Sequence, residues 1–189
     1  MNPSPRLKPA ALAVAALLPL PAFTEEAWDS KPLLSEFFAE GAAVGDLNGD
    51  GKPDLAYGPF WYAGPEFSEA KRFAPGEAFV AEKGYSDNFF SYIHDIDGDG
   101  KRDILVYGFP GKEARLYRNP GDPSSSTDWK MHLIAEQVAN ESPHFVDLIP
   151  GGLPEIVAAK ANAYGYYEAG SDPTQSWKWH AISETGEAA

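Results

Sequence analysis

The chain has 189 residues, of which 43% are hydrophobic and 13% aromatic, enough apolar material for one domain with a core. It carries 28 acidic and 15 basic residues, and the resulting formal charge of −13 disfavours binding of nucleic acid or another polyanion to its surface. Cysteine is absent, so the core or bound metal ions must stabilise the fold without disulfides.

The N-terminal segment has the form of a secretory signal peptide. Arg6 and Lys8 precede an apolar stretch at residues 10–20. This stretch is shorter than the roughly 20 apolar residues that a membrane-spanning helix needs. We therefore expect residues 1–22 to be removed on export and residues 23–35 to lead into the folded part. The expected location is secreted, periplasmic or at the cell surface. The alternative is an uncleaved anchor or a disordered tail.

An acidic loop followed by an apolar run occurs three times along the chain. The segments are DLNGDGKPDLAYG from Asp46, DIDGDGKRDILVYG from Asp95 and the eroded DLIPGGLPEIVAA from Asp147. Aromatic segments follow each loop, and WKMHLI and WKWHAI close the second and third repeats. Short apolar runs between Gly, Pro and Asp turns predict about four strands per repeat, which is the size of a β-propeller blade.

The predicted fold is therefore all-β, a partial β-propeller of about three four-stranded blades near residues 36–84, 85–136 and 137–189. Three blades cannot close a ring, because about four are the usual minimum. An open arc exposes apolar sheet faces. We expect either further blades in a longer protein or closure through an oligomer.

The first two loops place oxygen atoms where a calcium ion could bind them. Side-chain oxygens stand at loop positions 1, 3, 5 and 9, and the backbone carbonyl at position 7 adds another. Calcium takes roughly six to eight hard oxygen ligands, and water completes the set. We expect two Ca²⁺ sites, with ligands from Asp46, Asn48, Asp50, Lys52 and Asp54 in the first loop and from Asp95, Asp97, Asp99, Lys101 and Asp103 in the second.

The third loop departs from this pattern, because Ile149 and Gly151 replace the ligands at positions 3 and 5. We expect the loop at Asp147 to hold no ion. The first two loops are not EF-hands, since position 12 is Tyr57 or Val106 instead of Glu. Two alternatives to calcium remain there: magnesium, which suits so many protein oxygens less well, and polar hairpin turns without an ion.

Polar and aromatic residues gather just before the second and third loops, where propeller loops commonly bind ligands. The candidate ligand residues are Tyr85, Asp87, Asn88, Asn140, Glu141 and His144. Amide, hydroxyl and carboxylate groups beside Phe89 and Phe90 would suit a sugar. The alternative is strand-end capping and ordinary turn chemistry. The sequence contains no nucleophile elbow, Gly-rich phosphate loop or His-rich metal motif, so we assign no catalytic residue.

The pattern D-x-[DN]-x-D-G-x-x-D, followed by an apolar strand and a glycine, resembles the FG-GAP/VCBS repeat. The resemblance covers about residues 36–182. It implies a calcium-dependent β-propeller similar to the integrin α-subunit head, usually with about seven blades. The segments GPFWYAGP, GYSDNFFSYIHDIDGDG, VYGFPGKEA and NESPHFVDL look like secreted bacterial proteins similar to the propeller part of aldos-2-ulose dehydratase, a sugar lyase.

These patterns together predict a secreted calcium-binding propeller module, with structural calcium, that binds a protein or a carbohydrate. The alternative is the N-terminal part of a carbohydrate-active lyase or isomerase, and we do not expect the chain alone to be an enzyme. No nucleic-acid partner and no membrane span after signal removal are expected. Missing blades or oligomer partners are expected, and fold alone cannot choose among these functions.

Overall fold

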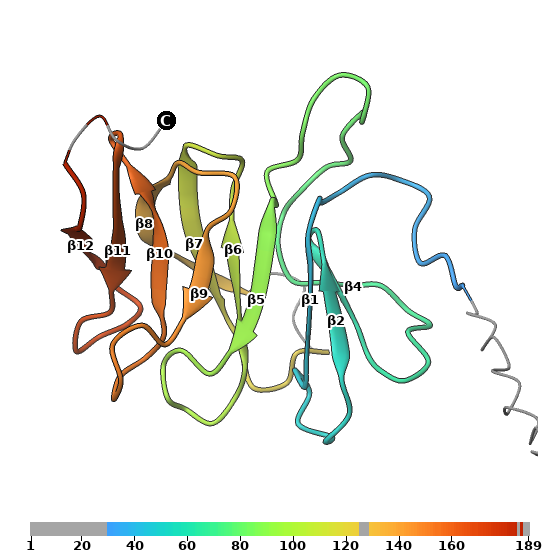
Figure 1. Cartoon of the computed structure of the whole chain (residues 1–189). Helices are drawn as coiled ribbons and strands as arrows, with labels where there is room; N and C mark the ends of the chain where they lie inside the picture. Colours follow the sequence, from blue (N-terminus) through green and yellow to red (C-terminus); the bar gives the residue numbers. More distant parts are fainter. Residues whose placement is uncertain (1–29, 125–128, 185, 187–189) are drawn as a thin grey trace, which may run out of the picture. The chain divides into compact units, whose positions relative to one another are not determined.

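The computed structural model describes residues 30–124, 129–184 and 186, and within them it contains twelve β-strands and no helix (Figure 1). The strands form three antiparallel sheets of four. The predicted all-β fold is thereby confirmed, as a partial β-propeller of three blades that do not close a ring. No helix that could cross a membrane occurs in this part of the chain. The predicted signal peptide, residues 1–22, lies outside the described residues.

Each sheet uses four strands that follow one another in the chain, so one sheet corresponds to one sequence repeat. The first sheet contains β1 (Ala42–Gly45), β2 (Asp54–Tyr57), β3 (Phe60–Tyr62) and β4 (Lys71–Arg72). The second contains β5 (Phe90–His94), β6 (Asp103–Tyr107), β7 (Lys112–Arg118) and β8 (Lys130–Val138). The third contains β9 (His144–Val146), β10 (Glu155–Lys160), β11 (Ala163–Glu168) and β12 (Lys178–Ala181).

The sheets pack face to face, with the second in the middle. Ala56 and Trp61 of the first sheet share a buried cluster with Ile104 of β6. The next residue of β6, Leu105, belongs to a second cluster with Ile156 of the third sheet. Successive residues of a strand point to opposite faces. Strand β6 is therefore buried along its whole length, which explains its unbroken apolar run.

The two outer faces of this stack differ. On the first sheet, Tyr62 is buried by its own chain, and the Phe38 ring packs edge-on against Phe60 at a centroid distance of 5.1 Å. On the third sheet, Tyr164 and Ile182 are 45% and 68% exposed. The third sheet thus presents an uncovered apolar surface, which is typical of the end of an open row of blades.

Candidate metal loops and ligand pocket

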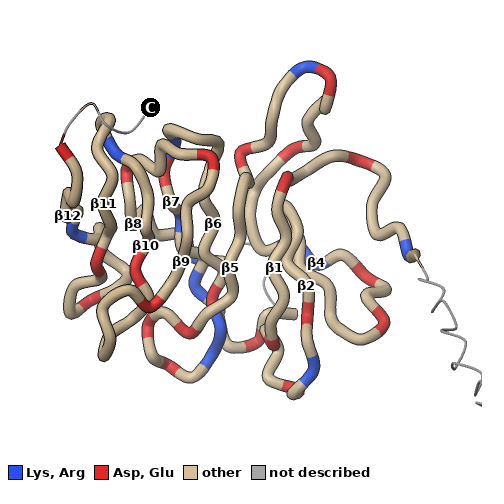
Figure 2. The backbone as a smooth tube through the Cα atoms, viewed as in Figure 1, with Lys and Arg blue, Asp and Glu red and all other residues tan. Residues whose placement is uncertain are grey.

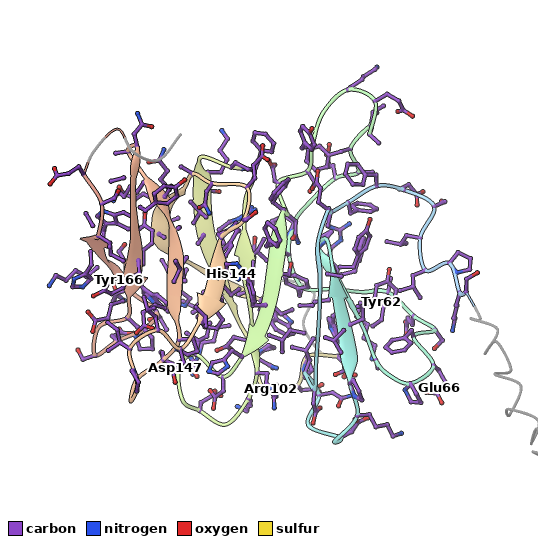
Figure 3. The ribbon with its side chains drawn as sticks, viewed as in Figure 1. Tyr62, Glu66, Arg102, His144, Asp147 and Tyr166 are labelled. Carbon is purple, nitrogen blue, oxygen red and sulfur yellow. The ribbon has the colours of Figure 1, made fainter. Side chains whose placement is uncertain are left out.

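The two acidic loops lie at one edge of the sheets, where they join β1 to β2 and β5 to β6 (Figures 1 and 2). Figure 2 shows acidic and basic residues gathered in these loops at the lower edge. Arg102 of the second loop and Asp147 of the third lie at this edge as well (Figure 3). The repeat therefore places its three loops next to one another in space as well as in equivalent places in the sequence.

Glycines shape both loops. Gly49 and Gly51 have φ angles of 76° and 81°, and Gly98 and Gly100 have 74° and 86°. Glycine adopts this left-handed region without the penalty that a Cβ imposes. A Cβ at any of the four positions would meet no atom within 4 Å, so the requirement concerns the backbone conformation and not space. The D-G and N-G pairs of the motif are explained by this turn.

Backbone N–H groups of the loop hold its carboxylates in place. In the second loop, Asp95 accepts hydrogen bonds from Gly98 at 2.9 Å and from Gly100 at 3.0 Å. The carboxylates at positions 3 and 5 each accept the N–H two residues later. The first loop repeats every one of these bonds. Both tips are therefore built in the same way.

Three carboxylates converge at the tip of the second loop. One oxygen atom from each of Asp95, Asp97 and Asp99 lies within 4.8 Å of the others. Two oxygens on one calcium ion, each at roughly 2.3–2.6 Å, are at most about 4.6–5.2 Å apart. The cluster therefore fits a hard cation of this size. It is the one such group of three acidic, His or Cys side chains among the residues that the structure describes.

Each loop has a deeper carboxylate at position 9 that accepts hydrogen bonds from backbone N–H groups at the loop base. We call this carboxylate the brace of the loop. Asp54 and Asp103 are 0% and 1% exposed. Asp54 accepts hydrogen bonds from Leu47 N at 2.8 Å and from Gly64 N at 2.9 Å. Asp103 accepts the equivalent bond from Ile96 N at 3.0 Å. Burial raises the pKa of Asp103 to about 6, although backbone N–H donors act in the opposite direction.

The third loop also has a buried carboxylate at position 9, but its tip differs from those of the first two loops. Glu155 is 3% exposed and accepts hydrogen bonds from Leu148 N at 2.9 Å and Ile149 N at 3.1 Å. Pro150 occupies the loop position at which the other two loops have Gly49 and Gly98. Its ring fixes φ at about −65°. The tip of the third loop therefore cannot adopt the conformation of the other two. This supplies a second reason, besides the missing ligands, for the prediction that it holds no ion.

Asn119 connects the first two loops. It follows β7 and is buried, and its Nδ2 donates to the carbonyl oxygens of Leu47 and Arg102, each at 2.9 Å. Its own N–H donates to Asp103 at 2.8 Å. One side chain thus joins the base of the first loop to the base of the second. Sequence reasoning missed Asn119, and only its place at the end of the aromatic segment RLYRNP marks it.

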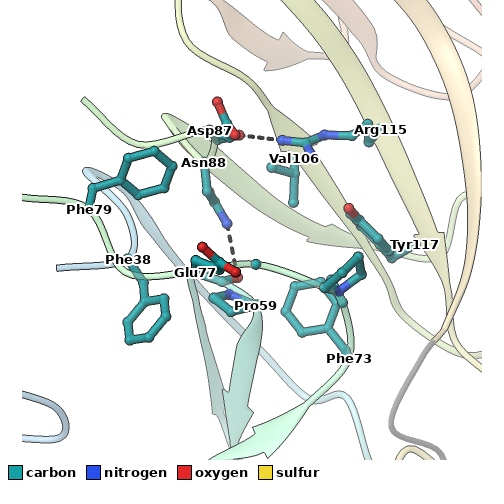
Figure 4. A pocket seen from close by; sticks show the side chains of 14 residues that line it. Phe38, Pro59, Phe73, Glu77, Phe79, Asp87, Asn88, Val106, Arg115 and Tyr117 are labelled. Atoms are coloured by element: carbon teal, nitrogen blue, oxygen red, sulfur yellow. Dashed lines mark hydrogen bonds between the residues drawn. The ribbon is translucent and has the colours of Figure 1, made fainter. Parts of the chain in front are cut away.

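A pocket of about 80 Å³ lies between the first and second sheets (Figure 4). Asp87 and Asn88 precede β5 whereas the acidic loop follows it, so the pocket is at the end of β5 away from that loop. Arg115 of β7 donates to the carbonyl oxygen of Asp87, and its Nε lies 3.7 Å from Glu113 Oε1. The lining includes Phe38, Phe73, Phe79, Glu77, Asp87, Asn88, Arg115 and Tyr117. Aromatic walls thus meet charged groups of both signs.

Only two of the six candidate ligand residues line this pocket, Asp87 and Asn88. The amide of Asn88 already has partners, since Nδ2 donates to Gly58 O at 2.9 Å and Oδ1 accepts from Ser91 at 2.8 Å. Asn88 therefore contributes to the joint between the two sheets. The side chain of Asp87 is exposed and makes no hydrogen bond within the described residues.

The other four candidates lie elsewhere. Tyr85 is 63% exposed, and its ring stacks on Phe109 at a centroid distance of 5.2 Å. Asn140 accepts a hydrogen bond from Ala159 N at 2.9 Å, which is a strand-end contact of the third sheet. Glu141 is exposed, and His144 lies exposed on β9 (Figure 3). The structure therefore does not gather the six residues into one site.

Residues 38–65 match the family model of the FG-GAP repeat. The matched segment contains β1, β2, β3 and the first acidic loop. No curated protein matches the chain, so the resemblance to aldos-2-ulose dehydratase has no support beyond the segments that suggested it. The first sheet with its acidic loop is therefore similar to an FG-GAP repeat, and this match supports the predicted relation to the FG-GAP family.

Proposed function

We propose that this chain is a calcium-stabilised β-propeller module that binds a ligand. The cluster of Asp95, Asp97 and Asp99, on a tip preformed by glycine turns and backbone hydrogen bonds, carries the calcium part. The first loop has the same backbone bonds and one amide in place of a carboxylate. A carboxylate oxygen has two acceptor positions, so Asp54 and Asp103 can brace the loop and also ligate.

Calcium would relieve the crowding of like charges at each tip. Neighbouring carboxylates disfavour one another's ionised form, and a divalent cation reverses this effect. An ion that binds only the folded chain stabilises it by mass action, by about 2.7 kcal/mol at a concentration of 100 times Kd. We expect millimolar to sub-millimolar affinity, as in extracellular calcium modules. FG-GAP repeats are typical of extracellular and surface proteins, which supports an exported location.

Calorimetric titration and thermal melting of the full chain test the calcium proposal. Calcium should bind at two sites and raise the melting temperature, EDTA should reverse the effect, and magnesium should act more weakly. A variant with Asp147→Asn serves as the matched control, because it removes an acidic side chain from the third loop only. A melting curve that calcium and EDTA leave unchanged, with no heat of binding, would contradict the proposal.

For the ligand we propose a carbohydrate at the pocket between the first two sheets. Aromatic rings suit the apolar faces of a sugar, and the Asp87 carboxylate and the Arg115 guanidinium suit its hydroxyl groups. A protein partner that inserts a polar side chain is the other ligand class. We propose no catalytic function, because no observation favours the lyase or isomerase alternative.

A glycan array with the full chain tests this ligand class. Binding should be lost in Asp87→Ala and in Glu77→Gln, and it should persist in Glu141→Gln, whose side chain lies outside the pocket. Sugar binding that depends on Glu141 and is indifferent to Asp87 would place the ligand at the third sheet instead. Absence of any sugar binding, together with capture of a defined protein, would replace the carbohydrate by a protein ligand.

We propose further that residues 1–22 are removed on export, that residues 23–35 lead into the folded part, and that the propeller region spans residues 36–189. N-terminal sequencing of the exported protein would locate the cleavage position. An intact N-terminus on exported protein would contradict the signal-peptide prediction.

A further inference from the structure

A basic side chain lies on the candidate calcium cluster of the second loop. Arg118, the last residue of β7, forms an ion pair with Asp97, and its Nη2 lies 3.3 Å from Asp99 Oδ2. The Lys101 ammonium lies 3.5 Å from the same Asp99 oxygen. Two of the three clustered carboxylates therefore have a cationic partner that belongs to the chain.

Arg118 contacts the carboxylate oxygen atoms that the backbone of the loop leaves without a donor. Oδ1 of Asp97 accepts the N–H of Asp99, and Oδ1 of Asp99 accepts the N–H of Lys101. The remaining oxygen of each carboxylate, Oδ2, accepts from Arg118. These are the atoms with which Asp97 and Asp99 would ligate an ion most freely. A guanidinium and a metal ion would therefore compete for the same lone pairs.

Among the residues that the structure describes, the first loop has no such cationic partner. Tyr62 pairs with Leu55 as Tyr117 pairs with Ile104, so Ala63 takes the place of Arg118 in the first sheet. Within the described residues, no ion pair reaches the carboxylates of the first loop. The first loop also has Asn48 where the second has Asp97. The additional carboxylate and the additional cation thus occur together in the second loop.

The Arg118 side chain also has space to move away from the second loop. Its side chain is 44% exposed and borders a groove of about 320 Å³, which is lined further by Trp129 and Lys130. Long side chains keep their charged ends in water when space allows. Displacement from the loop would therefore cost the guanidinium little in solvation.

We propose that Arg118 is an internal counter-cation of the second loop, which calcium must displace in order to bind. The inference rests on the proposed calcium function and adds a difference between the two sites. Arg118 lowers the calcium affinity of the second loop and keeps that loop ordered when calcium is scarce. The first loop lacks this substitute and depends more on the ion.

Calcium titration of the full chain, followed by amide NMR, separates the two loops. The N–H groups of Gly49 and Gly51 report on the first loop, and those of Gly98 and Gly100 report on the second. Arg118→Gln should lower the Kd of the second loop about three- to tenfold, because two exposed ion pairs that compete with calcium are lost. The Kd of the first loop should stay unchanged.

Lys130→Gln is the matched control. Lys130 pairs with Arg118 across the β7–β8 ladder and borders the same groove, and no ion pair joins it to the loop within the described residues. Lys130→Gln removes one positive charge from the same surface as Arg118→Gln does, so a general electrostatic effect on calcium binding would appear in both variants. Arg118→Lys keeps the charge and loses the planar fork, and its Kd should lie between those of the native chain and Arg118→Gln.

The outcomes separate this inference from the proposed function. Calcium binding at both loops, with equal Kd values for the second loop in the native chain, Arg118→Gln and Lys130→Gln, would overturn the role of Arg118 and leave the calcium function intact. The same holds if the first loop binds and the second binds in no variant. Absence of binding at both loops in every variant would overturn both proposals. Binding at the second loop only in Arg118→Gln would support the inference most directly.

Discussion

The second and third acidic loops occupy equivalent places in neighbouring sheets, and only the second gathers carboxylates at its tip. Both have a buried carboxylate that accepts backbone N–H groups at the loop base, Asp103 in one and Glu155 in the other. They differ at the tip, where Pro150 replaces Gly98 and no carboxylate remains at positions 3 and 5. The buried carboxylate therefore builds the turn between the first two strands of each sheet, and the tip carries the proposed cation site. The two properties are separable.

Removal of the brace should have the largest effect. Glu155→Ala leaves two backbone N–H groups at the loop base without an acceptor, and we expect the free energy of unfolding to fall by about 2–4 kcal/mol. Urea unfolding followed by tryptophan fluorescence measures the change. Asp147→Ala, in the same loop and outside the brace, should change it by less than about 0.5 kcal/mol. Equal effects of the two variants would show that the third loop does not depend on its buried carboxylate.

Removal of the Asn119 link between the first two loops should have the second-largest effect on stability. Asn119→Ala removes the donor to Leu47 O and Arg102 O, and we expect a loss of about 1–3 kcal/mol. The third sheet has Ala169 at the equivalent place and serves as an internal reference, because its loop folds without such a link. The same urea unfolding measures the loss. If stability is unchanged while the spectra of Gly49 and Gly98 stay native, the link is unimportant.

Removal of a tip ligand should have a smaller and calcium-dependent effect. Asp97→Ala should abolish calcium binding at the second loop and leave the stability in EDTA within about 1 kcal/mol of the native value, because the side chain is not part of the brace. Melting curves with and without calcium check both statements. The calcium-induced rise in melting temperature should shrink and not vanish, because the first loop still binds. A complete loss would indicate a single site.

Conversion of the third loop into one that resembles the second should have the smallest effect. It tests whether a glycine turn and two added ligands are sufficient for calcium binding. The triple change Ile149→Asp, Pro150→Gly and Gly151→Asp restores the glycine turn and two ligands, and we expect weak calcium binding, at millimolar Kd. The double change without Pro150→Gly should not bind, because proline cannot adopt a positive φ. Calorimetry decides between them. Equal binding by the double and the triple variant would show that ligand identity alone determines the site.

Much of the fold could be predicted from the sequence. The repeat, the strand runs and the loops are local patterns, and β6 in particular shows its burial as an unbroken apolar run. The short outer strand β4, only Lys71–Arg72, has a much weaker sequence signal. For the site, the sequence predicted the crowding of oxygens at the tips. It could not separate the buried brace from the tip, because burial depends on how sheets pack and not on spacing.

The three repeated hairpins with acidic turns follow from local sequence, because turn chemistry and strand alternation act between residues close in the chain. The distant groups that contact these turns are brought there by the packing of strands and sheets. Arg118 lies 21 residues from its partner Asp97, and Asn119 lies 72 residues from Leu47. The pocket at Asp87 likewise exists only where two sheets pack against each other. Such contacts depend on the register between strands and sheets, which local preferences do not specify.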